Sequence, residues 1–311
     1  MNVIETKGLS KRYRSTWAMR DFTMAIPAGH VAALVGPNGA GKTTLLNLVV
    51  GLAAPSVGTV TVLGGEPAGS PAALDDIAFV AQDAPLYKNL PVADMLRLTS
   101  YLNRRFDDGY ARERLSELGI PLKRKAGKLS GGQQAQLALT LALARRPRLL
   151  VLDEPLANLD PLARHDFMAT VLAAAAERGE GEVGGMSVVL SSHVLAELER
   201  VADYLILVSG GQVQVVGEVD GLLARHRVLT GPAGAADRIA RRLPVVYVRR
   251  AGAQAHLLVR TSGPDEPVPP GWEAHPVSLE ELVLSYLREP GAAALPGPAR
   301  TQKAEPMEVT R

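Results

Sequence analysis

The stretch Gly36-Pro37-Asn38-Gly39-Ala40-Gly41-Lys42-Thr43 decides the fold of this chain, because it matches the phosphate-binding pattern G-x-x-x-x-G-K-[ST]. Glycines in such a loop let backbone N–H groups approach phosphate oxygens, and the lysine reaches the β- and γ-phosphates. The apolar run Val31–Val35 precedes the loop, and an apolar helical pattern follows from Lys42 to about Leu52. Strand, loop and helix in this order predict an α/β protein that binds a nucleoside triphosphate.

Further short apolar runs predict strands that are buried on both faces. They do not alternate with polar residues, which is typical of strands covered on both faces in α/β proteins. The predicted strands are Ile77–Val80, Leu149–Leu152, Ser187–Leu190 and Tyr204–Val208, and the predicted helices are Pro91–Asn103, Gly131–Arg145 and Pro161–Arg178. Pro91 suits a first helical position. A surface loop is expected at 179–185, where Gly and Glu cluster.

The length of 311 residues is enough for two domains. We expect an ATP-binding domain at 1–218, a small α+β accessory domain at 219–289 and a disordered, Pro-, Ala- and Gly-rich tail at 290–311. In the accessory domain the predicted strands are Arg227–Leu229, Val245–Val248 and His256–Val259, and the predicted helices are Ala235–Arg242 and Ser278–Leu287.

Composition excludes several classes of protein. The chain has no cysteine, so it has no disulfide or thiolate metal site. A formal net charge of +2 is too small to indicate nucleic acid as a partner. The N-terminus lacks a signal-peptide pattern, and no apolar run approaches the roughly 20 residues that span a bilayer. We therefore expect a soluble, cytoplasmic protein, and a transport function would require membrane subunits encoded separately.

Two carboxylates follow the apolar run Leu149–Leu152, so Asp153 and Glu154 are expected at the carboxyl edge of the sheet, near the phosphate loop. Asp153 suits the Mg²⁺ shell, through water, because Mg²⁺ keeps several of its waters. Glu154 is placed to polarise an attacking water as general base. In isolation the pair could equally well cap a strand end, and the upstream phosphate loop favours the catalytic interpretation.

The third motif, Leu129-Ser130-Gly131-Gly132-Gln133, opens a predicted helix with Ser130 as its N-cap. Local physics leaves two interpretations open. The motif is either a plain helix start or a second anion site, because the first N–H groups of a helix lack intrahelical partners.

Together the motifs resemble the nucleotide-binding subunit of an ATP-binding cassette (ABC) transporter, over about residues 3–217. The resemblance implies a P-loop NTPase cassette: a RecA-like core with an antiparallel β subdomain and a helical subdomain. In that family the signature Leu129–Gln133 faces the γ-phosphate held by the other subunit. The resemblance therefore implies a homodimer, or a heterodimer with a related cassette, that closes on two ATP molecules and hydrolyses them.

Four more residues match landmarks of the family in order along the chain. Tyr13 matches an aromatic residue that stacks on adenine, and Gln82 matches a glutamine that senses Mg²⁺. Asp160 matches the acidic member of a loop that links the two ATP sites in the family, and His193 matches a histidine that contacts the γ-phosphate. The implied catalytic residues are Lys42, Gln82, Glu154 and His193; the Mg²⁺ shell is Thr43, Gln82 and Asp153; and the nucleotide contacts are Tyr13, Gly36, Pro37, Asn38, Gly39, Ala40, Gly41, Lys42, Thr43, Thr44, Ser130, Gly131, Gly132, Gln133 and Asp160.

The context Ser191-Ser192-His193 and the C-terminal segment Ser278–Val283 resemble bacterial exporters of drugs, antibiotics or lipids, whereas importers more often have Thr-His-Asp. We therefore expect a motor at the cytoplasmic face of the membrane that powers export through separate permease subunits. The alternative is a soluble ABC ATPase that acts on nucleic acid or ribosomes. Such relatives carry two cassettes or an inserted coiled coil, and this chain has neither. A nucleotide kinase or a GTPase would have no use for the signature.

Overall fold

The computed structural model describes residues 1–65, 71–82, 86–157, 159–177, 185–192, 194–263 and 266–289. The tail at 290–311 and nearly all of the predicted loop at 179–185 lie outside these residues.

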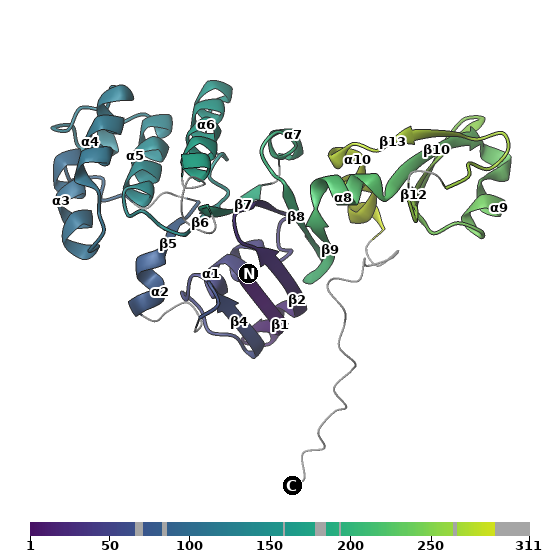
Figure 1. The fold of residues 1–311 in the computed structure, drawn as a ribbon, viewed down its shortest axis with the longest axis horizontal. Coiled ribbons are helices and arrows are strands. Elements are labelled where there is room, and N and C mark those ends of the chain that lie inside the picture. The colour runs from purple at the N-terminus through teal and green to yellow at the C-terminus, as the bar shows by residue number, and fades with distance from the viewer. Residues whose placement is uncertain are drawn as a thin grey trace, which may run out of the picture.

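A six-stranded sheet forms the centre of the molecule (Figure 1). Its strand order is β5 (Ile77–Val80), β6 (Leu149–Asp153), β7 (Ser187–Ser192), β3 (Val31–Val35), β8 (Tyr204–Ser209) and β9 (Gln212–Glu218). The first five strands are parallel and β9 is antiparallel to β8. Every strand predicted for this sheet is confirmed. The apolar runs form strands here because the sheet is covered on both faces, so nearly all of their side chains are buried. Strand β9 was not predicted.

The predicted helices of the core are confirmed with small differences. They are α1 (Lys42–Val49), α3 (Val92–Leu102), α5 (Gly131–Leu143) and α6 (Pro161–Glu177). Pro91 is the N-cap of α3, with an extended ψ of 150°, so the prediction that it occupies the first helical position was wrong. Helix α1 ends before Leu52 because Gly51 adopts a positive φ of 74°. The short helices α2 (Pro71–Asp76), α4 (Asp108–Glu117) and α7 (Leu195–Leu198) were not predicted.

A second sheet, antiparallel, has the order β2 (Thr16–Pro27), β1 (Asn2–Tyr13), β4 (Val57–Val62). Helix α1 contacts both this sheet and strand β6 of the central sheet. Its buried leucines, Leu45, Leu46 and Leu48, join residues of both sheets in one hydrophobic core. The loop that precedes α1 is therefore held between two packed sheets.

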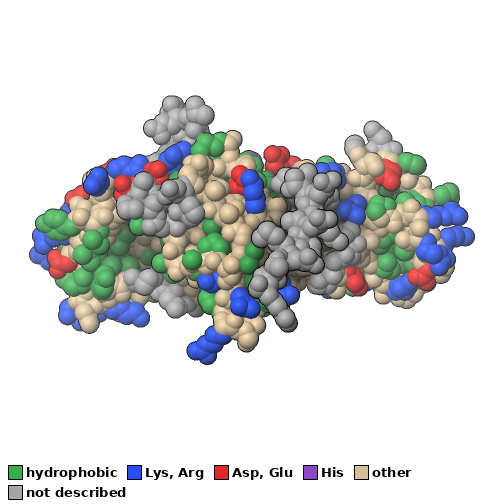
Figure 2. Space-filling view, turned by 90° about the horizontal axis from the view of Figure 1, so that it is seen from below, with side chains coloured by type: hydrophobic (Ala, Val, Ile, Leu, Met, Phe, Trp, Pro, Cys, Tyr) green, Lys and Arg blue, Asp and Glu red, His purple; other side chains and the backbone are tan. Residues whose placement is uncertain are grey.

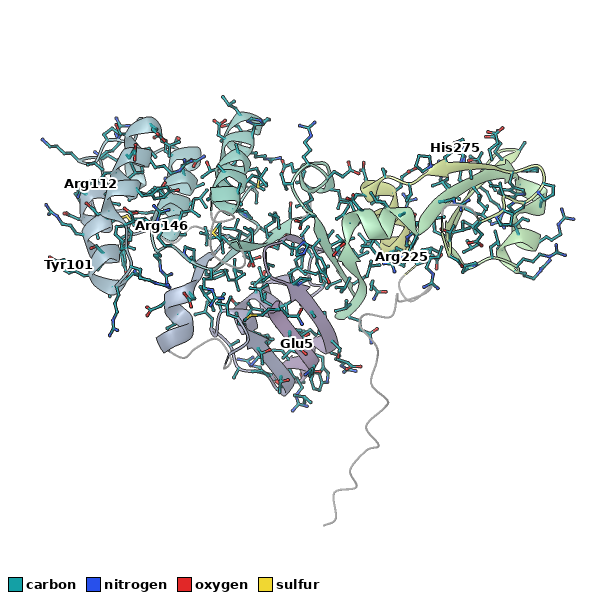
Figure 3. All side chains as sticks on the ribbon, viewed as in Figure 1. Glu5, Tyr101, Arg112, Arg146, Arg225 and His275 are labelled. Atoms are coloured by element: carbon teal, nitrogen blue, oxygen red, sulfur yellow. The ribbon has the colours of Figure 1, made fainter. Side chains whose placement is uncertain are left out.

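Helices α3, α4 and α5 form a separate group on the left in Figure 1, with a hydrophobic core of its own. Met95 and Leu96 are buried in that core, whereas Tyr101 and Leu102 at the end of α3 are 88% and 74% exposed. Figure 3 labels Tyr101 at the outer edge of the group, and Figure 2 shows hydrophobic side chains gathered on this end of the molecule.

The C-terminal part is a four-stranded sheet of order β11 (Val245–Ala251), β12 (Gln254–Arg260), β10 (His226–Pro232), β13 (Glu273–Pro276). Its helices are α8 (Val219–Ala224), α9 (Ala236–Ala240) and α10 (Leu279–Arg288). The predicted strands and helices of this part are confirmed, while α8 and β13 were not predicted.

Alternation along β12 covers both faces of this sheet, because successive side chains of a strand point to opposite faces. Leu257 packs in a cluster with Ile239 of α9 and Trp272, whereas Leu258 packs in a cluster with Tyr286 of α10. The second cluster is continuous with the core of the central sheet. Because one hydrophobic cluster contains residues of both parts, the division into two domains at 1–218 and 219–289 stays a proposal. No helix in the described ranges is both long and apolar enough to cross a bilayer.

Candidate functional site: a phosphate-binding pocket

The loop between β3 and α1 contains two glycines at positions where a side chain does not fit. A Cβ on Gly36 would lie 2.2 Å from the carbonyl oxygen of Val208. Gly41, the N-cap of α1, has a φ of +99°, and a Cβ there would lie 2.9 Å from the carbonyl oxygen of Ala18. Glycine therefore lets the backbone pass close to β8 and β2 and turn directly into the helix.

Lys42 is the first residue of α1 and its side chain is only 6% exposed. Its Nζ donates hydrogen bonds to the carbonyl oxygens of Gly36, at 2.8 Å, and of Pro37, at 3.4 Å. The same nitrogen lies 3.4 Å from Oε1 of Glu154. The ammonium group therefore lies where the glycine-rich loop and the carboxylate meet.

A pocket of about 360 Å³ brings most of the predicted residues together. Its lining is Ala18, Pro37, Asn38, Gly39, Gly41, Lys42, Thr43, Thr44, Gln82 and Glu154. Gly36 contributes the carbonyl that binds Lys42, and Ala40 is buried with its N–H donating to Pro37. Ala18, on β2, was not predicted, because a small apolar residue of an unidentified strand gives no sequence signal.

The two carboxylates follow each other at the tip of β6. Asp153 is 3% exposed and accepts a hydrogen bond from the Ser191 hydroxyl at 2.7 Å. Glu154 adopts a left-handed φ of +48°, which costs a residue other than glycine about 1–3 kcal/mol. Its N–H donates to the same hydroxyl, Ser191 Oγ, at 2.8 Å. These contacts of Ser191 were not predicted, because they depend on β7 lying beside β6.

The donor atoms around this pocket suit a Mg²⁺ ion. Thr43 offers a hydroxyl and Gln82 an amide oxygen on the lining, and Asp153 offers a carboxylate beside Glu154. Mg²⁺ prefers such oxygen ligands and is held by one or two carboxylates together with substrate phosphates and water. These residues therefore fit the metal that a bound nucleoside triphosphate carries.

The signature residues are not part of the lining described for this pocket. Ser130 is exposed and is the N-cap of α5, which confirms that part of the prediction. Its hydroxyl accepts the Gln133 N–H, and the Gln133 side chain accepts the Ser130 N–H, each at 3.2 Å. The amides of Gly131 and Gly132 begin the helix, where N–H groups have no intrahelical acceptor.

Two other predicted residues are not part of the described pocket lining, and a third lies outside the described residues. Asp160 is exposed and caps α6, because its Oδ1 accepts the Ala163 N–H at 3.0 Å. Tyr13 ends β1, is 47% exposed, and has the Lys11 ammonium 5.0 Å from its ring centre. His193 lies outside the described residues.

Comparison with known proteins agrees with the motifs. A family model described as ABC transporter matches residues 19–157. The Nod factor export ATP-binding protein I of Rhizobium leguminosarum bv. viciae is 32% identical over 230 residues, which are 71% of this chain and 70% of that protein. The chain belongs to the ATP-binding proteins of ABC transporters. Members of this family bind nucleotide, hydrolyse ATP to drive transport and work with membrane subunits.

Two further relatives differ in the parts they cover. The ABC transporter ATP-binding protein YtrB of Bacillus subtilis (strain 168) is 27% identical over 290 residues, 91% of this chain and 97% of YtrB. The Fe(3+) ions import ATP-binding protein FbpC of Mesorhizobium japonicum is 37% identical over 70% of this chain and 61% of FbpC.

Among solved structures, an ABC transporter ATP-binding cassette in its ADP conformation superposes with a TM-score of 0.61 at 25% identity, over 71% of this chain and 92% of that one. These matches establish the ABC ATPase fold that the motifs predict.

Proposed function

We propose that this ABC ATP-binding subunit powers export, and that two copies, or one copy and a related cassette, close on two Mg²⁺–ATP molecules. The observation that supports the closing step is the position of the signature. Ser130 and Gly131 are exposed at the start of α5 and do not belong to the lining of the pocket that holds Lys42. Exposed helix-start amides suit a phosphate brought by another molecule.

In this proposal the predicted site residues divide the work of binding and hydrolysis. The loop amides and Lys42 bind the β- and γ-phosphates, and Thr43, Gln82 and Asp153 hold Mg²⁺. When bound, the metal neutralises charge that develops on the phosphates. Glu154 orients the attacking water and accepts its proton. Tyr13 stacks on adenine, while His193 and Asp160 complete the contacts as the family resemblance implies.

The direction of transport rests on two observations. The motif Ser191-Ser192-His193 resembles that of exporters, and one relative at 32% identity is named for Nod factor export. FbpC, at 37% identity, is named for iron import, so direction needs a direct test. We propose a drug, an antibiotic, a lipid or a similar compound as cargo.

The contact with the membrane subunits is proposed on the helical group α3–α5. Tyr101 and Leu102 are exposed at the end of α3, and Tyr87 is exposed in the segment before it. Figure 2 shows hydrophobic side chains gathered at this end of the molecule, and such patches mark interaction sites. This contact would hold the subunit at the cytoplasmic face of the membrane.

Complementation tests the shared site. Lys42→Ala removes the phosphate lysine but keeps the signature, and Ser130→Arg blocks the signature but keeps the pocket. Neither variant alone should hydrolyse ATP, whereas a mixture should regain activity through mixed dimers with one intact site. Ser116→Arg, an exposed serine on α4, is the control and should stay active. Full turnover by Ser130→Arg alone would contradict the proposal.

Inside-out vesicles that contain the chain and its co-purified membrane subunits test direction. Export predicts that ATP added outside the vesicles drives cargo into the lumen, and this uptake should disappear with Glu154→Gln. ATP-driven loss of cargo from preloaded vesicles would instead establish import.

A further inference from the structure

Ser191 is a fully buried hydroxyl at the carboxyl end of β7, between strands β6 and β3. The three residues before it on the strand, Val188, Val189 and Leu190, are apolar, as expected for a strand covered on both faces, and Ser192 follows it. Burying a hydroxyl there is unfavourable unless it is hydrogen-bonded. The backbone of Ser191 already pairs with β6 and β3, so strand pairing does not explain the choice of serine.

The hydroxyl joins Glu154, which lines the pocket, to Asp153, which precedes it at the end of β6. It donates its hydrogen to Asp153 Oδ1 at 2.7 Å and accepts the N–H of Glu154 at 2.8 Å. Both capacities of the group are therefore used at one point, and both partners are neighbours in sequence.

The hydrogen bond that Ser191 accepts from the Glu154 N–H holds an unusual backbone conformation. Glu154 has a left-handed φ of +48°, which residues other than glycine rarely adopt. The orientation of its N–H toward Ser191 sets the plane of the peptide that joins Asp153 to Glu154. That plane in turn sets the direction in which the Glu154 side chain leaves the strand, toward the pocket that it lines.

The hydrogen bond that Ser191 donates holds the side chain of Asp153. Asp153 is 3% exposed, and the hydroxyl of Ser191 engages one oxygen of its carboxylate. A single hydroxyl therefore holds the side chain of Asp153 and the backbone from which the Glu154 side chain extends.

We propose that Ser191 is a positioning residue for ATP hydrolysis, which orients Asp153 through its side chain and Glu154 through its backbone. This inference rests on the proposed roles of Asp153 in holding Mg²⁺ and of Glu154 as base. Ser191 is fully buried and is not among the residues described as lining the pocket. Its loss should therefore affect turnover and the Mg²⁺ requirement, and should leave the affinity for ATP without metal almost unchanged.

The chain offers a matched control on the same strand. Ser187, at the other end of β7, is 2% exposed, and its Oγ accepts the N–H of Gly29 at 2.9 Å. Ser187→Ala removes a buried hydroxyl and a hydrogen bond to a backbone amide, as Ser191→Ala does, but away from the carboxylates. Ser191→Thr keeps the hydroxyl, and Ser191→Cys keeps the size of the side chain with a weaker donor.

The experiment measures kcat and KM for ATP, the Mg²⁺ concentration for half-maximal activity, and binding of a fluorescent ATP analogue with and without Mg²⁺. Ser191→Ala should lower kcat by about 10- to 100-fold, as expected for the loss of hydrogen bonds that orient charged groups. The Mg²⁺ needed to strengthen nucleotide binding should rise several-fold, and binding in EDTA should stay within about threefold. Ser191→Thr should restore kcat, Ser191→Cys should be intermediate, and Ser187→Ala should match the wild type.

A kcat for Ser191→Ala equal to that of Ser187→Ala would overturn the inference, and so would an unchanged Mg²⁺ requirement or a Ser191→Thr variant as slow as Ser191→Ala. Glu154→Gln separates this inference from the proposed function. Normal turnover in Glu154→Gln would refute the role of the base, whereas a slow Glu154→Gln beside a normal Ser191→Ala would refute the positioning role only.

Discussion

The Nζ of Lys42 lies 3.4 Å from Oε1 of Glu154, and both side chains are nearly buried, at 6% and 11% exposure. The phosphate-binding cation and the proposed base therefore form an ion pair within one pocket. Removing one member of a buried pair leaves a charge without its partner, which is more costly than the loss of an exposed pair. This relationship makes the two residues the most informative pair to change.

Replacement of Lys42 by alanine should weaken ATP binding by about 10- to 100-fold, because it removes charge-assisted hydrogen bonds to the phosphates. Isothermal titration calorimetry with ATP measures the effect. Lys7→Ala is the control, since Lys7 is 73% exposed and pairs only with Glu5 in the contacts described. An unchanged dissociation constant for Lys42→Ala would exclude Lys42 from phosphate binding.

Glu154→Gln should keep ATP affinity within a few-fold of the wild type and lower kcat by about 10²–10⁴, because the amide cannot accept a proton from water. ATP should then trap a dimer, visible by size-exclusion chromatography with light scattering. Glu113→Gln, at an exposed position on α4, should behave as the wild type. A Glu154→Gln variant with normal turnover would remove Glu154 from the mechanism.

Gly36→Ala should destabilise the fold and not only the site. Its Cβ would lie 2.2 Å from the carbonyl oxygen of Val208, a backbone atom that cannot move aside cheaply. Overpacking of this kind costs about 1–3 kcal/mol or more, and thermal unfolding should show a lower Tm. Gly221→Ala on α8, where a Cβ meets no atom within 4 Å, is the matched control and should not lower Tm.

The central sheet was predictable from the sequence because its strands are short apolar runs, such as Val31–Val35 and Leu149–Leu152, which are buried on both faces. The family resemblance implied an antiparallel β subdomain, but no residue ranges were predicted for its strands β1 and β2. Their burial patterns are irregular, and register shifts interrupt their pairing. Strand β13 was missed because all of its residues are exposed, so it has no apolar signal.

The pocket was predictable in part for a similar reason. The motif order indicated that Glu154 lies near Lys42, because strands of a parallel sheet end at a common edge. The contacts of Ala18 and Ser191 depend on which strands are neighbours, and no local pattern specifies this. The exposed position of Ser130 also has no local signal. The residues that begin a helix are of the same types whether the helix start is a plain cap or an anion site.

A last prediction concerns His226, which is buried where β10 meets α8 and α10. Its Nδ1 lies 2.7 Å from the Leu222 carbonyl, which can only accept, so Nδ1 carries the proton and donates. Its Nε2, 2.9 Å from the Tyr286 hydroxyl, therefore accepts from that group. Burial, with Arg260 and Arg225 nearby, lowers the pKa of His226 below its ordinary value of 6.5.

Because the folded chain holds His226 neutral, the unfolded chain binds more protons as pH falls below 6.5, and the free energy of unfolding should decrease there. Above pH 6.5 this contribution is fully present. Denaturant titrations between pH 5 and 8 should show the acid loss in the wild type and a flatter profile in His226→Gln. His275→Gln is the control, because His275 is on β13 (Figure 3) and its imidazole is 53% exposed. Equal acid slopes in the wild type and His226→Gln would show that the buried imidazole does not set the stability of this part at low pH.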